Sequence, residues 1–266
     1  MDKVRIICLV KIIPDVKNLV YDYEKNILVR ENRKSIINPD DVCAVAAALC
    51  LKEMLGADVS VLSMEPESNR TYLEDLIRRG VDRAYLITDP LFRGSDTYVT
   101  SKILVRSIKE KKYDLIFAGV HSWDGDTAHV PAQIAEFLNI TFMSYVTKIE
   151  KDNFKDGEVI LETAFEDIRN IFAVQIPAIF GISSESKYKL PFVKYENRKK
   201  DVSSLIQIET NNELNFSKEE VGLRGSKTKV VKMYPKKLNE QKKMIVKTDE
   251  AGINYVYEFL KEKGFL

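Results

Sequence analysis

The chain has 266 residues, of which 45% are hydrophobic and 30% charged, a composition typical of a folded protein rather than a disordered one. Its 41 Lys and Arg residues nearly balance its 40 Asp and Glu residues, giving a formal net charge of +1. We therefore expect no nucleic-acid partner and no direct membrane insertion, since no overall positive field would attract a polyanion or an acidic membrane surface.

The N-terminal segment predicts a buried strand. Residues from Val4 to Ile13 form a nearly continuous apolar run rich in β-branched residues, as expected for a strand covered on both faces of a parallel sheet. Lys11 breaks the run and Pro14 closes it. The run is too short for a membrane span and lacks a small-residue cleavage site.

The three cysteines predict buried thiols. Cys8, Cys43 and Cys50 lie in apolar segments, are odd in number and show no CxxC spacing, so neither a disulfide framework nor a metal site is indicated. Such thiols are typical of a reducing compartment, and we expect a cytoplasmic location.

Three more apolar runs continue the pattern. Val59–Met64, Ala84–Thr88 and Leu115–Gly119 are short and separated by helix-like stretches. This β-α-β-α rhythm over residues 1 to about 145 predicts a doubly wound, mostly parallel α/β sheet.

The helix starts carry clear local signals. Asn38–Asp41 offers a cap residue, a proline and two acids, and predicts a helix to about residue 54. Gly94–Thr97 predicts the start of another helix, to residue 109, and Gly125–Thr127 of a further one, to about residue 138.

The second half predicts an antiparallel addition. Val146–Glu150, Val159–Phe165 and Ile171–Gln175 alternate in strand-like fashion, with a turn at Lys155–Gly157. Pro177–Ile182 is a last apolar strand.

The C-terminal part predicts an arm and a helix. Residues 183–245 are polar, rich in lysine and weakly periodic, which indicates an extended arm outside the core. Thr248 or Asp249 would cap a final helix. Its apolar residues at helical spacing are Ile253, Val256, Tyr257 and Leu260. We therefore expect an α/β domain in residues 1–182, an arm in 183–245 and a docking helix in 246–266.

Three loop segments are candidates for ligand binding. Asn38–Asp41, Gly94–Thr100 and Trp123–Ala128 follow strands and open helices, and open α/β sheets bind ligands at such places. Glycines, threonine hydroxyls and exposed N–H groups suit a phosphate. The alternative is that the aspartates are ordinary helix caps and that Trp123 only packs.

Other chemistries find little support. The sequence has no GxGxxG after the first strand and no GxxxxGK[ST], which argues against a common dehydrogenase or ATPase. His121 and His129, eight residues apart, make no metal signature. No Ser/His/Asp or Cys/His order indicates nucleophilic catalysis. Glu166 and Asp167 are expected on a solvated surface.

The chain resembles the β subunit of electron-transferring flavoproteins over nearly its whole length, because it contains five of that family's motifs in the same order. They are the K-x-x-P-D turn at Lys11–Asp15, the I-N-P-x-D helix start at Ile37–Asp41, the G-[AS]-D-T-x-x-T-S segment at Gly94–Ser101, the D-G-D-T-A-x-V segment at Asp124–Val130, and the V-G-L-[KR]-G-S-x-T-K-V-V pattern at Val221–Val231.

The resemblance implies a larger α subunit as partner and an adenine-nucleotide pocket at these helix starts, making residues 1–182 the nucleotide-binding domain. The run Asp124–Ala128, in place of an N-Q-T-G-type run, together with the G-S-D-T-x-x-T segment at Gly94–Thr100, resembles the electron-bifurcating type. That type binds FAD in the β subunit, accepts electrons from NADH, and divides them between ferredoxin or flavodoxin and a partner dehydrogenase through the α-subunit FAD. The alternative is the electron shuttle of acyl-CoA dehydrogenases, in which AMP is a structural ligand.

The resemblance also implies the site residues, with the adenosine near Lys11 and Asn38 and no side chain acting as acid or base. Asp96 and Asp126 would cap backbone N–H groups or accept a ribose hydroxyl. The full set of implied cofactor-binding residues is Lys11, Asn38, Asp41, Ser63, Asp96, Thr97, Thr100, Gly119, Asp124, Gly125, Asp126, Thr127, Ala128 and Val130. Outside the family, the rival is an ATP-using enzyme or nucleotide sensor. An ATP pyrophosphatase of this fold would need an S-G-G-x-D-S-type loop that is absent after the first strand.

The predicted arm would carry the α-subunit contacts and the family's recognition loop, at Tyr188–Phe192. Leu190 would be the apolar anchor inserted into a partner dehydrogenase, with neighbouring lysines steering the encounter; the alternative is a solvated linker. The sequence departs from the family in two places. His129 stands where the family has a glutamine, and Val130-Pro131-Ala132 lacks the glycine of the usual V-G-P. Residues 192–200 replace the usual I-M-K-A-K-K-K.

Overall fold

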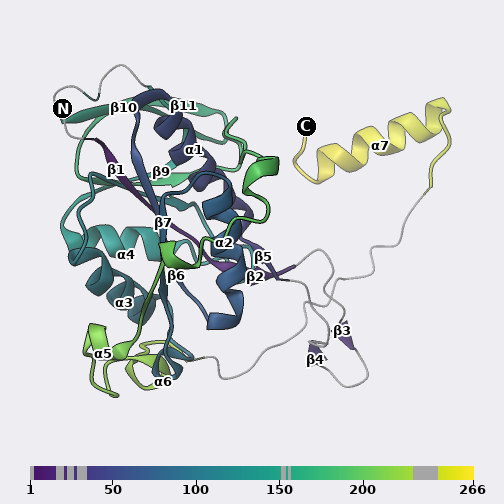
Figure 1. The fold of residues 1–266 in the computed structure, drawn as a ribbon. Coiled ribbons are helices and arrows are strands. Elements are labelled where there is room, and N and C mark those ends of the chain that lie inside the picture. Colours follow the sequence, from purple (N-terminus) through teal and green to yellow (C-terminus); the bar gives the residue numbers. More distant parts are fainter. Residues whose placement is uncertain are drawn as a thin grey trace. The chain divides into compact units, whose positions relative to one another are not determined.

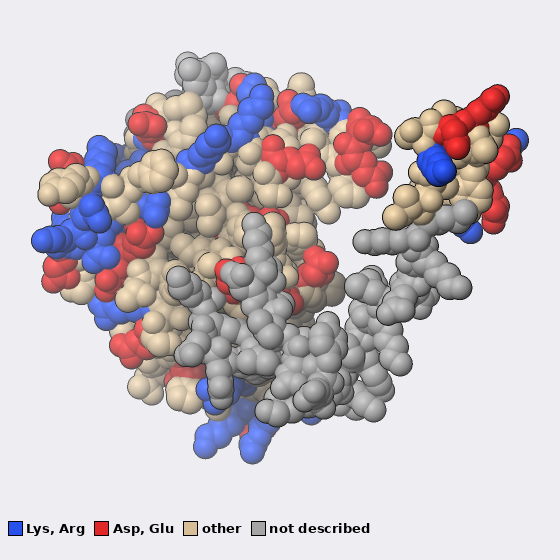
Figure 2. All heavy atoms as spheres, turned by 90° about the vertical axis from the view of Figure 1, so that its right-hand side faces the viewer, with Lys and Arg blue, Asp and Glu red and all other residues tan. Residues whose placement is uncertain are grey.

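The computed structural model describes residues 3–15, 21–22, 27–28, 35–150, 154, 157–229 and 245–266. The chain divides into two compact units, Met1–Lys229 and Val230–Leu266. Basic and acidic side chains are interspersed on the face that Figure 2 shows, in keeping with the balanced composition.

A nine-stranded sheet organises the first unit (Figure 1). Its order is β11-β10-β9-β12-β8-β1-β6-β7-β13. Every neighbouring pair from β9 to β13 is parallel, whereas β10 pairs antiparallel with both β9 and β11. The strands are β1 (Arg5–Leu9), β6 (Asp58–Met64), β7 (Arg83–Ile87), β8 (Leu115–Gly119), β9 (Thr141–Ile149), β10 (Glu158–Phe165), β11 (Ile168–Gln175), β12 (Ala178–Ile182) and β13 (Ile206–Glu209). The predicted fold class is confirmed.

Helices cover both faces of this sheet (Figure 1). Residues of α1 and α2 pack with Ile6 and Cys8 of β1 in one core cluster, whereas residues of α3 and α4 pack with Ile7 and Leu9 in the other. Successive residues of a strand point to opposite faces, so this alternation shows that β1 is buried on both sides. The helices are α1 (Pro39–Leu55), α2 (Arg70–Arg78), α3 (Thr97–Lys109), α4 (His129–Leu138), α5 (Asn211–Leu214) and α6 (Gly222–Gly225), with short 3-10 turns at Glu67–Asn69, Pro90–Phe92, Tyr195–Asn197 and Ser203–Leu205.

The first apolar run is not one strand, and that prediction was wrong. β1 ends at Leu9, and residues Ile12–Pro14 form β2, which pairs antiparallel with β5 (Ser35–Ile37) in a separate small sheet. The chain leaves the large sheet at Lys11, whose backbone N–H donates to a side chain of α1 rather than to a strand. Another two-stranded pair joins β3 (Tyr21–Asp22) and β4 (Ile27–Leu28).

Part of the predicted arm belongs to the core. β13 adds a parallel strand beside β7 at the edge of the sheet. The apolar residues of this stretch that are buried are Val202, Ile206, Leu214, Phe216 and Val221. They are too widely spaced among polar residues to show a helical or strand period, which is why the sequence indicated an arm. Residues 230–244 of the predicted arm, and Lys155 and Asp156 of the predicted turn, lie outside the described residues.

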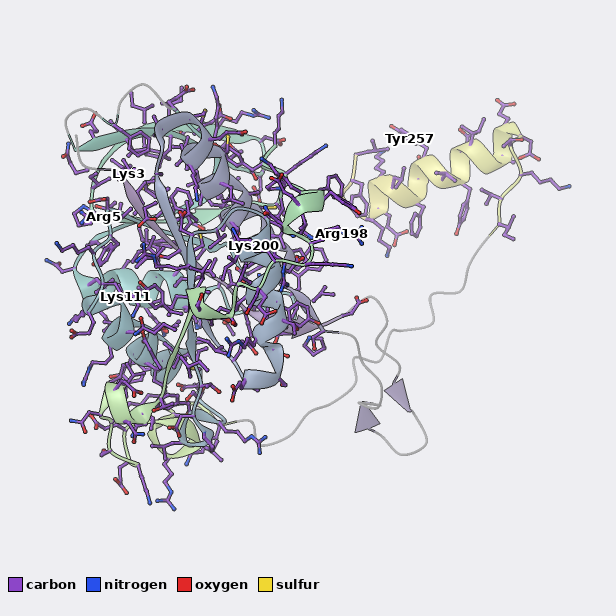
Figure 3. The ribbon with its side chains drawn as sticks, viewed as in Figure 1. Lys3, Arg5, Lys111, Arg198, Lys200 and Tyr257 are labelled. Atoms are coloured by element: carbon purple, nitrogen blue, oxygen red, sulfur yellow. The ribbon has the colours of Figure 1, made fainter. Side chains whose placement is uncertain are left out.

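The second unit contains the predicted C-terminal helix, α7 (Glu250–Glu262). Asp249 caps it, since its carboxylate accepts the N–H of Gly252 at 2.9 Å. Ile253 and Tyr257, two of the predicted apolar residues, are exposed. Figure 3 labels Tyr257 on this helix. Across the described ranges, no helix combines the length and the apolar character that crossing a bilayer requires.

Candidate functional site

The topology creates a crevice between the carboxyl ends of β1 and β8. The chain goes from β1 through α1 to β6 on one side, whereas β8 lies on the other side of β1. The following helices, α1 and α4, cover opposite faces of the sheet. The two loops therefore diverge, as they do at the switch point where doubly wound sheets bind ligands.

Asn38 joins the loops that follow the two strands. Its side-chain Nδ2 donates to the carbonyl of His121 at 2.8 Å, and its Oδ1 accepts the N–H of Trp123 at 3.1 Å. Its own N–H donates to the carbonyl of Lys11 at 2.9 Å. Because Asn38 is only 1% exposed, these bonds are shielded from water. Asn38 therefore connects the loop after β1 to the loop after β8.

The buried Asp41 side chain also connects the segments that follow β1 and end β8. Its two carboxylate oxygens accept the backbone N–H of Lys11 at 2.8 Å and that of Gly119 at 3.0 Å. Burial raises the pKa of Asp41 to about 7, against hydrogen bonds from Lys11, Asn38 and Gly119 that lower it. Asp41 thus ties α1 to the ends of both strands.

Gly119 allows this close approach. A Cβ at this position would lie 2.5 Å from the Cβ of Asp40 and 2.6 Å from Oδ1 of Asp41. Contacts this short do not occur between real side chains, so only glycine lets the start of α1 pack against the end of β8.

Lys11 and Asp124 form an ion pair between the loops on the two sides of the crevice. The Lys11 Nζ lies 2.7 and 2.8 Å from the two carboxylate oxygens of Asp124, and 3.4 Å from the Ser122 hydroxyl. Partial burial opposes ionisation of Asp124, but the hydrogen bond and charge of Lys11 hold the pKa of that carboxyl below its usual value. Both side chains remain partly exposed, so a ligand can reach them.

The loop after Ser122 differs from the prediction. Asp126 and Ala128 have left-handed backbone conformations, with φ of 50° and 53°, and α4 begins at His129 rather than at Gly125–Thr127. The N–H of Asp126 turns back to the carbonyl of Ser122 at 2.8 Å. This local turn delays the helix, and it leaves residues 124–128 exposed at the surface.

Asp40 and His121 form a connection that the sequence analysis did not assign. The Asp40 carboxylate accepts the Trp123 Nε1–H at 3.2 Å and lies 3.5 Å from Nε2 of His121. The other ring nitrogen of His121 lies 2.8 Å from Oδ1 of Asp126. A hydrogen bond therefore orients the indole ring of Trp123, which stays 38% exposed. Only the position of His121 beside the Asp124–Thr127 turn could have drawn attention to it.

A pocket of about 290 Å³ lies beside these groups. Asp40 and His121 line one part of it, and the ring pair of Tyr145 and Phe165, with centroids 4.6 Å apart, lines another. Glu166, predicted on a solvated surface, also lines it.

The start of α3 holds the next group of predicted residues. Asp96 is the cap of this helix, since its Oδ1 accepts the N–H of Val99 at 3.0 Å. Thr97 and Thr100 in the first turn are partly exposed. One turn on, the Ser101 hydroxyl donates to Oε1 of Gln133 in α4 at 2.9 Å, so α3 and α4 meet near their beginnings.

Two of the remaining predicted residues lie at the margin of the crevice. Ser63 at the end of β6 is buried and donates to the carbonyl of Val10 at 2.7 Å. Val130 is half-buried and packs against the core on the α3–α4 face. Neither shows an arrangement specific to a ligand.

Leu190 is half-buried and packs against the core, whereas Phe192, two residues later, is 91% exposed. Tyr195 is 89% exposed, and Arg198 and Lys200 lie on the same segment (Figure 3). The most exposed apolar group of the predicted recognition loop is therefore aromatic.

The described part of the chain contains no cluster of three or more His, Cys, Asp or Glu side chains that could hold a metal ion. Its fold and crevice define a doubly wound α/β protein of the kind that binds ligands at the carboxyl edge of its sheet.

The chain belongs to the electron transfer flavoprotein family, whose domain it matches over residues 25–202. It is 36% identical to an electron transfer flavoprotein subunit beta of Clostridium acetobutylicum, over 98% of this chain and 99% of that one. A subunit of the same name from Thermoanaerobacterium thermosaccharolyticum is 39% identical, covering 85% and 86%. The caffeyl-CoA reductase-Etf complex subunit CarD of Acetobacterium woodii is 33% identical, covering 86% and 87%. The chain is thus a β-type member of this electron-transfer family.

Proposed function

We propose that this chain pairs with a larger α subunit and binds FAD between the β1–β8 crevice and the starts of α3 and α4. In this proposal the heterodimer accepts electrons from NADH and divides them between ferredoxin or flavodoxin and, through the α-subunit FAD, a partner dehydrogenase. The three cysteines are free thiols, which supports a cytoplasmic location for this chemistry.

The observation that carries the proposal is the meeting of α3 and α4 at Ser101 and Gln133. Each of these residues is the fifth of its helix, so each helix begins about 6 Å along its axis from this contact. The first turns of α3 and α4 contain no acid, whereas α1 has two. Exposed N–H groups at the starts of two helices whose first turns carry no acid suit a diphosphate.

The residues around these helix starts fit the rest of the nucleotide. Thr97, Thr100 and Thr127 have hydroxyls that can donate to phosphate or ribose oxygens, and Lys11 offers a cation at the crevice. Bound FAD would supply the redox chemistry. The protein's own residues bind and orient it, and none is required as an acid or a base.

The choice of FAD rests on the run Asp124–Ala128, which resembles the bifurcating type. The relative from A. woodii, named as a subunit of a reductase complex, supports coupling to a dehydrogenase. The alternative is a structural AMP in a shuttle that serves acyl-CoA dehydrogenases; the same helix starts would hold its single phosphate.

The test is to count flavins in the heterodimer purified from co-expression with its α subunit. Two FAD per heterodimer and reduction by NADH support the proposal, whereas one FAD with AMP supports the shuttle. Thr97→Val and Thr127→Val should each lower the retained second flavin. Thr147→Val is the matched control, because the Thr147 hydroxyl donates to the carbonyl of Glu162 in β10. Unchanged flavin content would remove the two threonines from the site.

We also propose that Phe192 shares with Leu190 the contact to the partner dehydrogenase. Phe192 is exposed amid lysines and arginines, which suits an acidic partner surface. Phe192→Ala should slow electron transfer to the partner at least tenfold (about 1.4 kcal/mol) without lowering flavin content. Leu190→Ala tests the family's anchor, and Leu205→Ala, an exposed leucine of the same stretch, is the control.

A further inference from the structure

We propose that Ser226 and Thr228, within the V-G-L-R-G-S-K-T run, are positioning residues of the nucleotide site. They would hold the Asp96 carboxylate as the cap of α3 and so direct the first turn of that helix toward the ligand. The inference rests on the proposed function, in which this run has no part.

Thr228 donates two hydrogen bonds to the Asp96 side chain. Its backbone N–H donates to Oδ2 of Asp96 at 2.8 Å, and its hydroxyl donates to the same oxygen at 3.1 Å. The other oxygen, Oδ1, accepts the N–H of Val99 at 3.0 Å. Both carboxylate oxygens are thus bound within the protein.

Ser226 holds the backbone of the same residue. Its Oγ accepts the N–H of Asp96 at 2.9 Å and donates to the carbonyl of Gly222 at 2.8 Å. Ser226 is buried, so these bonds do not compete with water. Together Ser226 and Thr228 fix both the main chain and the side chain at the start of α3.

The hydrogen bonds from Ser226 and Thr228 make Asp96 a helix cap rather than a direct ligand of the nucleotide. Burial opposes its ionisation, but hydrogen bonds from Val99, Thr228 and Lys227 hold the pKa of Asp96 below its usual value. The carboxylate stays charged at neutral pH, and donors from the protein surround it. It therefore acts on a phosphate through the helix that it caps, rather than by accepting a ribose hydroxyl.

Gly222 lets the run approach the loop before α3. Its φ is +61°, and a Cβ there would lie 2.4 Å from the carbonyl oxygen of Leu91. A side chain would push residues 222–228 away from that loop. This close fit explains why a segment 130 residues away in sequence from Asp96 belongs to the start of α3.

Lys227 adds a positive charge at the same place. Its Nζ lies 5.6 Å from the ring centroid of Tyr98, in the first turn of α3. The cation partly offsets the charge of Asp96, so the start of α3 can accept an anion.

The test measures binding of FAD, and separately of AMP, to the full-length heterodimer after removal of bound nucleotide. Thr228→Val removes one donor to the carboxylate and should weaken binding about fivefold to tenfold. Thr228→Ser keeps the hydroxyl and should bind within twofold of wild type. Ser226→Ala provides a second variant if Thr228→Val folds poorly.

Hydrogen exchange supplies a readout that a purely structural role would not change. Nucleotide should slow exchange at residues 94–100 and 226–229 together in wild type, and less at 226–229 in Thr228→Val. Equal affinities of wild type and Thr228→Val, or no protection of 226–229, overturn this inference alone. Failure of the wild-type heterodimer to bind either nucleotide overturns the proposed function and this inference with it.

Discussion

Asp40 and Asp41 are adjacent acids at the start of α1 with different tasks. Asp40 faces the crevice and holds Trp123 and His121. Asp41 turns inward and binds the backbone at the ends of both strands. The two side chains leave α1 in different directions, so one residue can shape the site while its neighbour stabilises the fold.

Asp41 should make stability depend on pH. Its pKa is raised to about 7 in the folded protein, so its stabilising contribution is complete below about pH 4 and is lost as pH rises through about 7. From pH 5 to pH 8, the free energy of unfolding should fall by roughly 1–3 kcal/mol more in wild type than in Asp41→Asn. Urea unfolding at both pH values checks this, and equal changes would contradict it.

Gly119 should tolerate no side chain. Gly119→Ala would bring a Cβ within 2.8 Å of the backbone of Asp40, so we expect a loss of about 1–3 kcal/mol in the free energy of unfolding. Gly125→Ala is the control, because its nearest atom, Oγ of Ser122, would be 3.7 Å away. Denaturant unfolding of the two variants should differ clearly; similar values would argue against the tight contact.

At the scale of elements, β13 is held to the sheet by a buried ion pair. Glu209 in β13 lies 2.6 Å from the Lys111 Nζ, with side chains only 5% and 9% exposed. The Ser107 hydroxyl donates to the second carboxylate oxygen at 2.6 Å, and the Lys111 ammonium lies 4.2 Å from the Tyr85 ring centroid. These contacts tie the edge strand to α3 and β7.

Breaking this pair should cost far more than breaking an exposed one. Lys111→Met leaves the Glu209 carboxylate buried without its cation, and we expect a loss of about 3–5 kcal/mol in the free energy of unfolding. Lys148→Met, which breaks an exposed pair with Glu150, should cost less than about 1 kcal/mol. Denaturant unfolding measures both. Adding Glu209→Leu to Lys111→Met should recover part of the loss; no recovery would contradict the argument.

At the scale of the whole molecule, the chain consists of a sheet unit and a C-terminal unit with exposed apolar residues on α7. Such residues on an amphipathic helix suit a partner's surface, which in the proposed function is the α subunit. The expected docking of this helix stays a prediction.

Charges on the apolar face of α7 should impair assembly. Ile253→Asp with Val256→Asp should lower the yield of co-purified α subunit, because a buried unpaired carboxylate is costly. The melting temperature of the isolated chain should stay near that of wild type. Asn254→Asp, on another side of the helix, is the control. Undiminished heterodimer yield would show that this face is not in the interface.

The sequence by itself determined the elements whose signals are local. β8 was predicted with its observed bounds, and Asp96 marked the start of α3, because an apolar run and a cap act within a few residues. The family motifs likewise located the loops that form the crevice.

Only the tertiary structure decided what depends on distant residues. The break after Leu9, the pairing of β13 with β7 and the contact of Thr228 with Asp96 each join segments far apart in the chain. A local pattern does not encode such contacts, since the partner atoms come from elsewhere in the fold. For the same reason, Asp41 was expected at a ligand, whereas the structure binds both of its carboxylate oxygens to backbone N–H groups at the ends of two distant strands.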